Sequence, residues 1–369
     1  MPRAQRLYLL DLLRGLASLA VVLWHYQHFF FVAPFTLPTG FSRSQQPFYP
    51  ALSLFYNEGS RAVQLFFVLS GFIFFFQYAE SIRIRTTGLY EFALLRFSRL
   101  YPLHAVTLVA IALGQHLYRG IEGQLFVYGC NDWKRFFLSA TFATDWLPSA
   151  HICPALNGPT WSLSVEIFLY ILFFAFARFL PKDWRFQLFL SATAVAIGLA
   201  IFELDGFHLL GEPVFCFFSG GICCLLWLRG STITEHKKMV LIALTLLIAS
   251  SICGYLFGLN TALVGIVLFP SAVLALASAQ NLHHKAGRSV RLIGDLTYST
   301  YLLHFPLQLI LALLVASKVI NLDFYSPIVW LGFFVGLIAI SALSYYLFER
   351  PAQSFIRRSF IARTQAFHS

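Results

Sequence analysis

The chain has 369 residues, of which 58% are hydrophobic and only 11% are charged. Soluble domains carry about 25% charged residues, so this composition excludes an ordinary water-soluble protein and indicates an integral membrane protein. The formal net charge is +10, but the basic residues lie in short segments between apolar runs. That pattern is typical of membrane topology, so we expect no nucleic-acid partner.

Ten apolar stretches have the length needed to cross a hydrocarbon core roughly 30 Å thick. They run approximately over residues 9–32, 62–78, 100–117, 160–179, 187–202, 207–228, 240–257, 262–279, 292–317 and 327–348. The first is not expected to be a cleaved signal peptide, because Asp11 and Arg14 interrupt it and no small-residue cleavage site follows. We expect an all-α polytopic membrane protein with a single domain over 1–369, a core of about 9–351 and a basic tail over 352–369.

The distribution of lysine and arginine predicts the orientation. With the N-terminus in the cytoplasm, the inside segments hold 20 basic residues and the outside segments hold 6. Basic residues accumulate on the cytoplasmic side, so we expect both termini in the cytoplasm and a multi-pass protein of the cell inner (plasma) membrane. Two long outside loops, 33–61 and 118–159, could cap a site, bind a polar partner or serve as ordinary connections.

The chain contains six cysteines. Four lie in apolar runs and are expected to be buried, inert thiols: Cys216, Cys223, Cys224 and Cys253. Cys130 and Cys153 share the second long loop and could form a disulfide, although the sequence does not fix their separation. No histidine or cysteine spacing matches a metal site, so we expect no metal.

The first apolar stretch carries three ionisable residues, Asp11, Arg14 and His25. Arg14 and His25 are almost three helical turns apart, so their side chains point the same way at a separation of roughly 16 Å along the axis. Ionisable groups at such depth normally face a bundle interior or an aqueous cavity. The stretch therefore predicts a helix around whose polar face the other helices pack.

Two other stretches carry polar residues near their middle or start. Ser70 and Gly71 lie in the middle of the second stretch, where a small pair also lets helices approach closely. Arg96 and Arg99 share one helix face at the start of the third stretch. They are either a topology anchor or an anion site, because guanidinium groups match phosphate geometry.

The fourth and ninth stretches add further polar positions. Glu166 lies about 9 Å inside the fourth stretch, and Ser162 precedes it by one turn. A carboxyl group there needs a partner or a proton, whether its role is structural or catalytic. The ninth stretch carries four polar residues on one stripe at a 4, 3, 4 spacing, namely Thr297, Tyr301, His304 and Gln308. His304 is more readily interpreted as a satisfied core or pocket histidine than as a catalytic residue.

In order along the chain, the segments are LDLLRGLASLAVVLWH, LFFVLSGF, RFSRLYP, TWSLSVEIFLY, IGDLTYSTYLLHFP and FERP. Together they resemble the acyltransferase-3 family of membrane O-acyltransferases. The most specific feature is an arginine and a histidine separated by ten residues, here Arg14 and His25. The resemblance implies a ten-helix bundle without the C-terminal esterase-like domain of some relatives. Ile167 follows Glu166 where a second acid is frequent, and Gln64 stands where an acid is often found.

The resemblance implies transfer of an acyl group, usually acetyl, from acyl-coenzyme A to a carbohydrate hydroxyl. Acyl-coenzyme A would be a co-substrate with no bound cofactor, and the other partners would be a glycan or glycolipid acceptor and the lipid bilayer. His25 would be the general base, with Glu166 orienting it or stabilising its charged form. The expected substrate-binding residues are Arg14, Arg96, Arg99, Ser70, Ser162, Tyr301 and His304.

Two other classes of protein also fit these residues. A transporter or a lipid-linked-sugar flippase would use Arg14, His25 and Glu166 as a proton or substrate path and would need no acyl donor. A structural membrane subunit would leave the arginine pair and the buried glutamate without a role.

Overall fold

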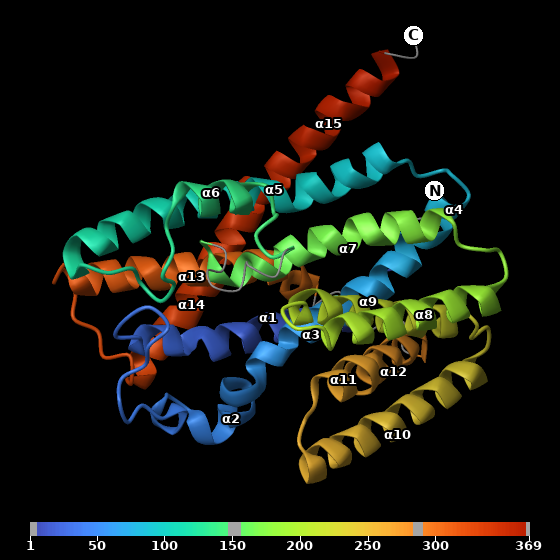
Figure 1. Ribbon diagram of the computed structural model, residues 1–369, viewed down its shortest axis with the longest axis horizontal. Helices are drawn as coiled ribbons and strands as arrows, with labels where there is room; N and C mark the ends of the chain where they lie inside the picture. Colours follow the sequence, from blue (N-terminus) through green and yellow to red (C-terminus); the bar gives the residue numbers. More distant parts are fainter. Residues whose placement is uncertain (1–5, 147–155, 283–290, 367–369) are drawn as a thin grey trace.

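The computed structural model describes residues 6–146, 156–282 and 291–366, which form a bundle of helices (Figure 1). In chain order the helices are α1 Tyr8–His25, α2 Tyr49–Glu58, α3 Ala62–Phe74, α4 Glu80–Arg83, α5 Leu89–Glu122, α6 Trp133–Ala140, α7 Trp161–Arg178, α8 Trp184–Phe202, α9 His208–Trp227, α10 Ile233–Phe257, α11 Thr261–Leu263, α12 Phe269–Leu282, α13 Arg291–Ala316, α14 Pro327–Ser344 and α15 Arg350–Ala366. These parts of the chain contain no named strand, and their only bridge is the isolated pair Ala33 and Thr36.

Ten helical spans within the described ranges are long and apolar enough to cross a membrane. They are Tyr8–Phe30, Tyr49–Arg83, Leu89–Glu122, Gly158–Arg178, Trp184–Phe202, His208–Trp227, Ile233–Phe257, Thr261–Gln280, Leu292–Ala316 and Pro327–Ser359. Each overlaps one stretch expected from the sequence, so the all-α, ten-span fold is confirmed. Arg6 and Arg357 line one cavity, which places both ends of the described chain at the same end of the bundle. The cytoplasmic position of that end stays a prediction.

Helical structure extends beyond the predicted apolar stretches. α2 and α6 lie inside the two long loops, and α5 begins at Leu89 instead of near residue 100. The first turns of α5 are more polar than the apolar stretch that the sequence predicts from residue 100. They are helical nevertheless, because backbone hydrogen bonds do not depend on apolar side chains.

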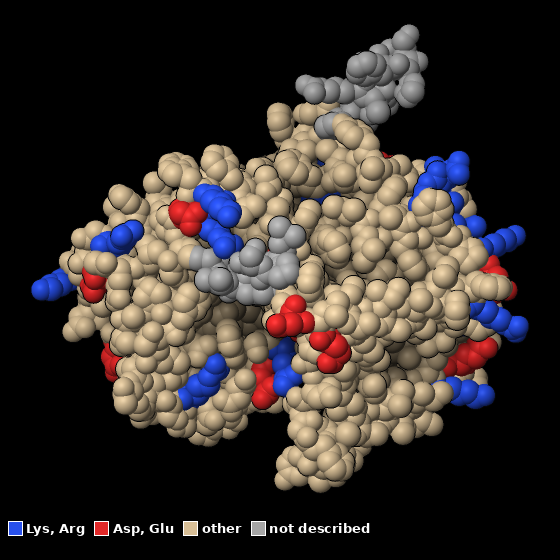
Figure 2. Space-filling view, viewed as in Figure 1, with Lys and Arg blue, Asp and Glu red and all other residues tan. Residues whose placement is uncertain are grey.

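The helices divide into central and peripheral ones. In the most apolar segment of each helix, 72% of the residues are buried in α9, but only 11% in α8 and 17% in α10. Figure 2 shows that most of one face of the molecule carries no charged side chain, as expected for a surface in contact with lipid. We therefore look for the functional polar residues on the central helices.

The cysteines follow this division. Cys216, Cys223 and Cys224 on α9 are free and buried, as expected. The expected burial of Cys253 is wrong, because this free cysteine is exposed on α10. An apolar sequence does not distinguish a helix that faces lipid from one that faces protein. Cys130 is disulfide-bonded, and its expected partner Cys153 lies outside the described residues.

Glycines bring α3 and α9 into backbone contact. A Cβ atom at Gly71 would lie 1.8 Å from the carbonyl oxygen of Phe217, and one at Gly220 would lie 1.9 Å from that of Val68. Neither distance is compatible with a side chain, so only glycine permits this crossing. Small residues commonly have this function between membrane helices.

Candidate active site

The polar face of α1 packs against α13. The Arg14 side chain donates from Nη2 to the carbonyl oxygen of Gly294 at 2.9 Å, and the Ser18 hydroxyl donates to that of Thr297 at 3.2 Å. Gly15 leaves room for Ile293, since a Cβ atom there would lie 2.2 Å from its side chain. The predicted polar face of the first helix is therefore covered by the polar stripe of the ninth span.

A polar cavity of about 420 Å³ lies at the end of the bundle where both ends of the described chain meet. We call it the arginine vestibule, after the six arginines that line it, Arg6, Arg14, Arg96, Arg99, Arg350 and Arg357. Three carboxylates share the lining, Asp11, Asp295 and Glu349. Six arginines against three carboxylates leave an excess of three positive charges, which favours a polyanionic ligand.

Two of these arginines have carboxylate partners. Arg6 lies 2.6 Å from both Asp11 and Asp295, and Arg14 lies 3.1 Å from Asp11. Burial opposes the charge of Arg6, but its hydrogen bonds to Asp295 and Asp11 outweigh that effect and raise its pKa. The other four vestibule arginines have no carboxylate oxygen within 4.0 Å in the described structure. They are available to bind an anion.

A narrower cavity of about 130 Å³ adjoins the arginine vestibule, and we call it the inner cavity. The two cavities share six lining residues, Asp11, Arg14, Ile73, Arg96, Arg99 and Tyr298. Much of the remaining wall is apolar, with Phe66, Phe67 and Leu163 among its members. Seven residues predicted as site residues line the inner cavity, namely Arg14, Arg96, Arg99, Ser70, Ser162, Glu166 and Tyr301.

Glu166 is bonded within the inner cavity and not to His25. Its Oε1 accepts hydrogen bonds from the Tyr170 hydroxyl at 2.5 Å and from the Ser70 hydroxyl at 3.4 Å. Among the described residues, the side chain hydrogen-bonded to the His25 ring is that of His304. The expected contact between Glu166 and His25 is therefore absent, because α13 and not α7 packs along α1.

His25 belongs to a cluster of three histidines. Its Nδ1 lies 3.2 Å from Nε2 of His304, and the two rings stack with centroids 5.0 Å apart. The ring of His28 lies 4.7 Å from that of His25. Gln308 connects the group, since its Nε2 donates to the carbonyl oxygen of His25 at 2.9 Å and its Oε1 lies 3.0 Å from Nδ1 of His28. We call these four residues the histidine cluster.

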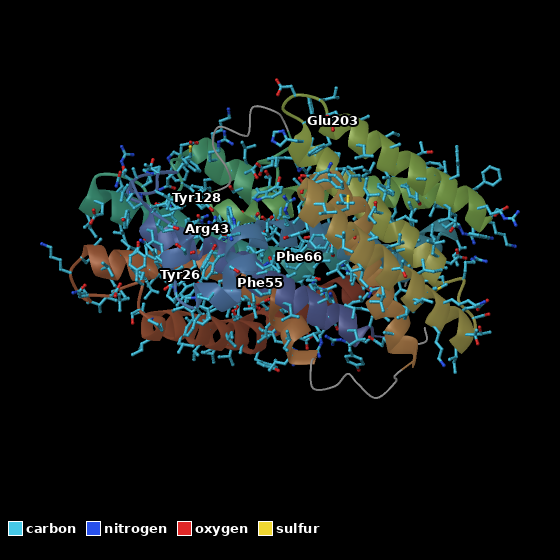
Figure 3. All side chains as sticks on the ribbon, turned by 90° about the horizontal axis from the view of Figure 1, so that it is seen from below. Tyr26, Arg43, Phe55, Phe66, Tyr128 and Glu203 are labelled. Atoms are coloured by element: carbon cyan, nitrogen blue, oxygen red, sulfur yellow. The ribbon has the colours of Figure 1, made fainter. Side chains whose placement is uncertain are left out.

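The two long loops cover the histidine cluster. Arg43 donates to Oε1 of Gln27 at 2.8 Å, and its guanidinium lies 5.3 Å from the ring centre of Trp24. The Tyr128 hydroxyl lies 3.4 Å from Nε2 of His28. Figure 3 labels Arg43 and Tyr128, together with Tyr26 of the segment that follows α1, in one part of the view. Burial lowers the pKa of Arg43 and raises that of Tyr128. The loops therefore place two partly desolvated side chains, a guanidinium and a phenol, beside the cluster.

Four residues of this region were not singled out from the sequence, namely Gln27, His28, Arg43 and Tyr128. His28 follows His25 by three residues, and this spacing could have indicated from the sequence that the two histidines lie close together. Gln27 and Arg43 gave no signal, because the fold of the loop alone brings them together. Within the described ranges, no three His, Cys, Asp or Glu side chains are arranged to hold a metal ion.

Residues 7–349 match the acyltransferase domain family Acyl_transf_3. Acyltransferase MdmB of Streptomyces mycarofaciens is 31% identical over 197 residues, which are 53% of this chain and 45% of that protein. Nodulation protein 10 of Rhizobium leguminosarum bv. viciae is 26% identical over 329 residues, which are 82% of this chain and 84% of that protein. The matched part is thus less than half of MdmB, and no solved structure matches the chain. With its ten spans, this multi-pass membrane protein belongs to the acyltransferase-3 family.

Proposed function

We propose that the protein is a membrane O-acyltransferase that moves an acyl group, in the simplest case acetyl, from acyl-coenzyme A to a hydroxyl of a carbohydrate or glycoconjugate. The observation that carries the proposal is the pair of adjoining cavities, an arginine vestibule that opens into a narrow and more apolar inner cavity. Family membership and a relative named as an acyltransferase support the reaction class.

Acyl-coenzyme A has the chemical shape that the two cavities require. Its phosphates form a polyanionic head, and guanidinium groups bind phosphate through paired hydrogen bonds. Its thin pantetheine arm carries the thioester and suits a cavity about a third as large as the vestibule. We assign the head to the arginine vestibule and the arm to the inner cavity. Because coenzyme A is a cytoplasmic compound, this assignment places the vestibule on the cytoplasmic side of the inner membrane.

His25 is the proposed general base. A sugar hydroxyl is a poor nucleophile and must lose its proton, and the ordinary pKa of histidine suits that transfer near neutral pH. A coenzyme A thiolate is a good leaving group, so no strong acid is needed. The Ser70 hydroxyl in the inner cavity is proposed to donate a hydrogen bond to the oxyanion that forms on the thioester. The Tyr301 hydroxyl donates to the carbonyl oxygen of Pro159 at 2.7 Å and would have to leave that partner to do the same.

The acceptor is assigned to the opposite side of the protein. The histidine cluster lies under the two long loops, whereas the arginine vestibule lies at the end where the described part of the chain begins and ends. A donor from the cytoplasm and an acceptor from the cell envelope would then meet at His25. Coenzyme A itself would not need to cross the membrane.

The test uses the full-length protein in detergent or in nanodiscs, with tritiated acetyl-coenzyme A and a cell-envelope glycan extract. We expect label in the glycan with the unmodified protein and none with His25→Ala or Arg14→Ala. All three proteins should give the same elution profile on size exclusion. Absence of donor binding and transfer in a folded unmodified protein would favour the transport function instead. Full transfer by His25→Ala would exclude His25 as the base.

A further inference from the structure

His304 contacts a group that only accepts hydrogen bonds. Its Nδ1 lies 2.6 Å from the carbonyl oxygen of Tyr301. A carbonyl oxygen has no hydrogen to donate, so Nδ1 of His304 must carry one. In the neutral ring Nε2 is then unprotonated and acts as an acceptor.

This protonation pattern determines that of His25. Nε2 of His304 lies 3.2 Å from Nδ1 of His25. Because Nε2 of His304 accepts, Nδ1 of His25 must donate, and Nε2 of His25 keeps its lone pair. His304 is 0% exposed and His25 is 8% exposed, so little water can compete for these ring nitrogens.

The other side of the histidine cluster is consistent with the same pattern. Gln308 uses its amide nitrogen to donate to the carbonyl oxygen of His25, which leaves Oε1 to accept from Nδ1 of His28. Nε2 of His28 is then free to accept from the Tyr128 hydroxyl. None of these contacts uses Nε2 of His25. The His25 ring also has a hydrogen bond to the backbone of Val21, one turn earlier in α1, so His304 acts together with the helix backbone on this ring.

We infer that His304 is a positioning residue that holds His25 in the tautomer whose Nε2 lone pair is free to take the proton of the acceptor hydroxyl. This inference rests on the proposed function and deepens it. In this inference His304, a neutral histidine, has the orienting role that the sequence suggested for Glu166. Fixing the tautomer of a catalytic histidine is the role of the carboxylate in serine hydrolases, where its loss costs about four orders of magnitude in kcat.

The reaction balances with the two substrates alone. The acceptor oxygen forms a bond to the thioester carbon while its proton moves to Nε2 of His25. The carbon–sulfur bond then breaks, and its electron pair leaves with the sulfur of coenzyme A. The thiolate takes the proton from Nε2, so His25 returns to the tautomer in which it began.

A histidine suits this position in a membrane better than a carboxylate. A carboxylate beside the His25 ring would have to lose its hydration in a low-dielectric interior, which is unfavourable for an ionised group. A neutral imidazole supplies the same lone pair without a buried charge. Its second nitrogen is anchored by the backbone of its own helix, which fixes the direction of that lone pair.

The experiment compares two amide variants of the full-length protein. His304→Gln keeps an amide oxygen near the position of Nε2, within reach of His25. His304→Asn is shorter, so it can bond the Tyr301 carbonyl but not His25. We expect kcat for acetyl transfer to fall roughly 100-fold in His304→Asn and less than roughly 10-fold in His304→Gln, within the range of general acid–base contributions. KM for acetyl-coenzyme A should change less than twofold in both, because neither cavity is lined by residue 304.

His104 on α5 provides the matched control. It is also buried, at 1% exposed, and its Nε2 lies 2.9 Å from the carbonyl oxygen of Ser139, away from both cavities. His104→Gln and His104→Asn should therefore have similar kcat values. Melting temperatures and size-exclusion profiles of all four variants report on folding independently of activity.

Equal kcat in His304→Gln and His304→Asn, at equal melting temperatures, would overturn the inference. So would an effect confined to KM. Failure of the proposed function looks different, because the unmodified protein would then show no transfer from acetyl-coenzyme A. Full transfer by His25→Ala would also contradict the proposed function, whatever happens at position 304.

Discussion

Arg96 shows how one side chain can be held by the fold and still be free for a ligand. Its guanidinium lies 5.2 Å from the ring centre of Phe74 and 5.0 Å from that of Tyr78, and it donates to the Tyr78 hydroxyl. Its Nε is buried with no partner in the described structure. A charge fixed by rings and left without a counter-ion is ready to bind an anion.

Replacing Arg96 with glutamine should weaken donor binding. A hydrogen bond to a charged group contributes about 1.5–3 kcal/mol, so we expect KM for acetyl-coenzyme A to rise roughly 10- to 100-fold with kcat nearly unchanged. Initial rates over a range of donor concentrations measure this. Arg83→Gln is the control, because Arg83 is paired with Glu80 and lines neither cavity. An unchanged KM in Arg96→Gln would remove Arg96 from the donor site.

Single residues also show the limit of the sequence. Arg14 and His25 were recognised because their spacing places them on one helix face. The partner of His25 could not be recognised in this way, because Glu166 and His304 are both polar residues in apolar helices. Only the packing of α13 on α1 decides between them.

At the scale of helices, glycine contacts set how closely the bundle packs. The crossing of α3 and α9 depends on Gly71 and Gly220, which bring the two backbones together next to the inner cavity wall formed by Ser70. The sequence offered two interpretations of Ser70 and Gly71, a packing pair or a site. In the structure each interpretation holds for one of the two residues: Gly71 packs against α9, and Ser70 lines the inner cavity.

Replacing Gly71 with alanine should destabilise the protein. The added Cβ would lie 1.8 Å from the carbonyl oxygen of Phe217, so the helices must separate. Overpacking of this kind costs about 1–3 kcal/mol, and thermal unfolding should occur at a lower temperature. Gly332→Ala on α14 is the control, because its Cβ would meet nothing within 4 Å. It should leave the melting temperature unchanged or raise it, through the better helix propensity of alanine. Equal melting temperatures for the two variants would show that α3 and α9 pack less closely.

At the scale of the whole molecule, the proposed reaction requires one orientation in the membrane. The arginine vestibule must face the cytoplasm, and the loops over the histidine cluster must face outward. The excess of basic residues in the segments assigned to the inside agrees with this arrangement.

Single cysteines at two exposed positions test the orientation. Lys318 follows α13 in an expected outside loop, and Lys237 lies in the first turns of α10 at the expected inside surface. In right-side-out vesicles, a membrane-impermeant maleimide should label Lys318→Cys and not Lys237→Cys, with the native cysteines of the unmodified protein as background. The opposite pattern would invert the topology and exclude cytoplasmic acyl-coenzyme A from the vestibule.

The sequence by itself determined the membrane class, the ten spans and the shared face of Arg14 and His25. These properties follow from local quantities, namely hydropathy over about 20 residues and the period of the helix. Tertiary structure alone decided which helices face lipid, as the exposed Cys253 shows, and which side chain bonds to His25. It also assembled six arginines, drawn from α1, α5, α15 and the segment before α1, into one cavity. Contacts between residues hundreds of positions apart depend on how helices pack, and no local pattern in the chain encodes that packing.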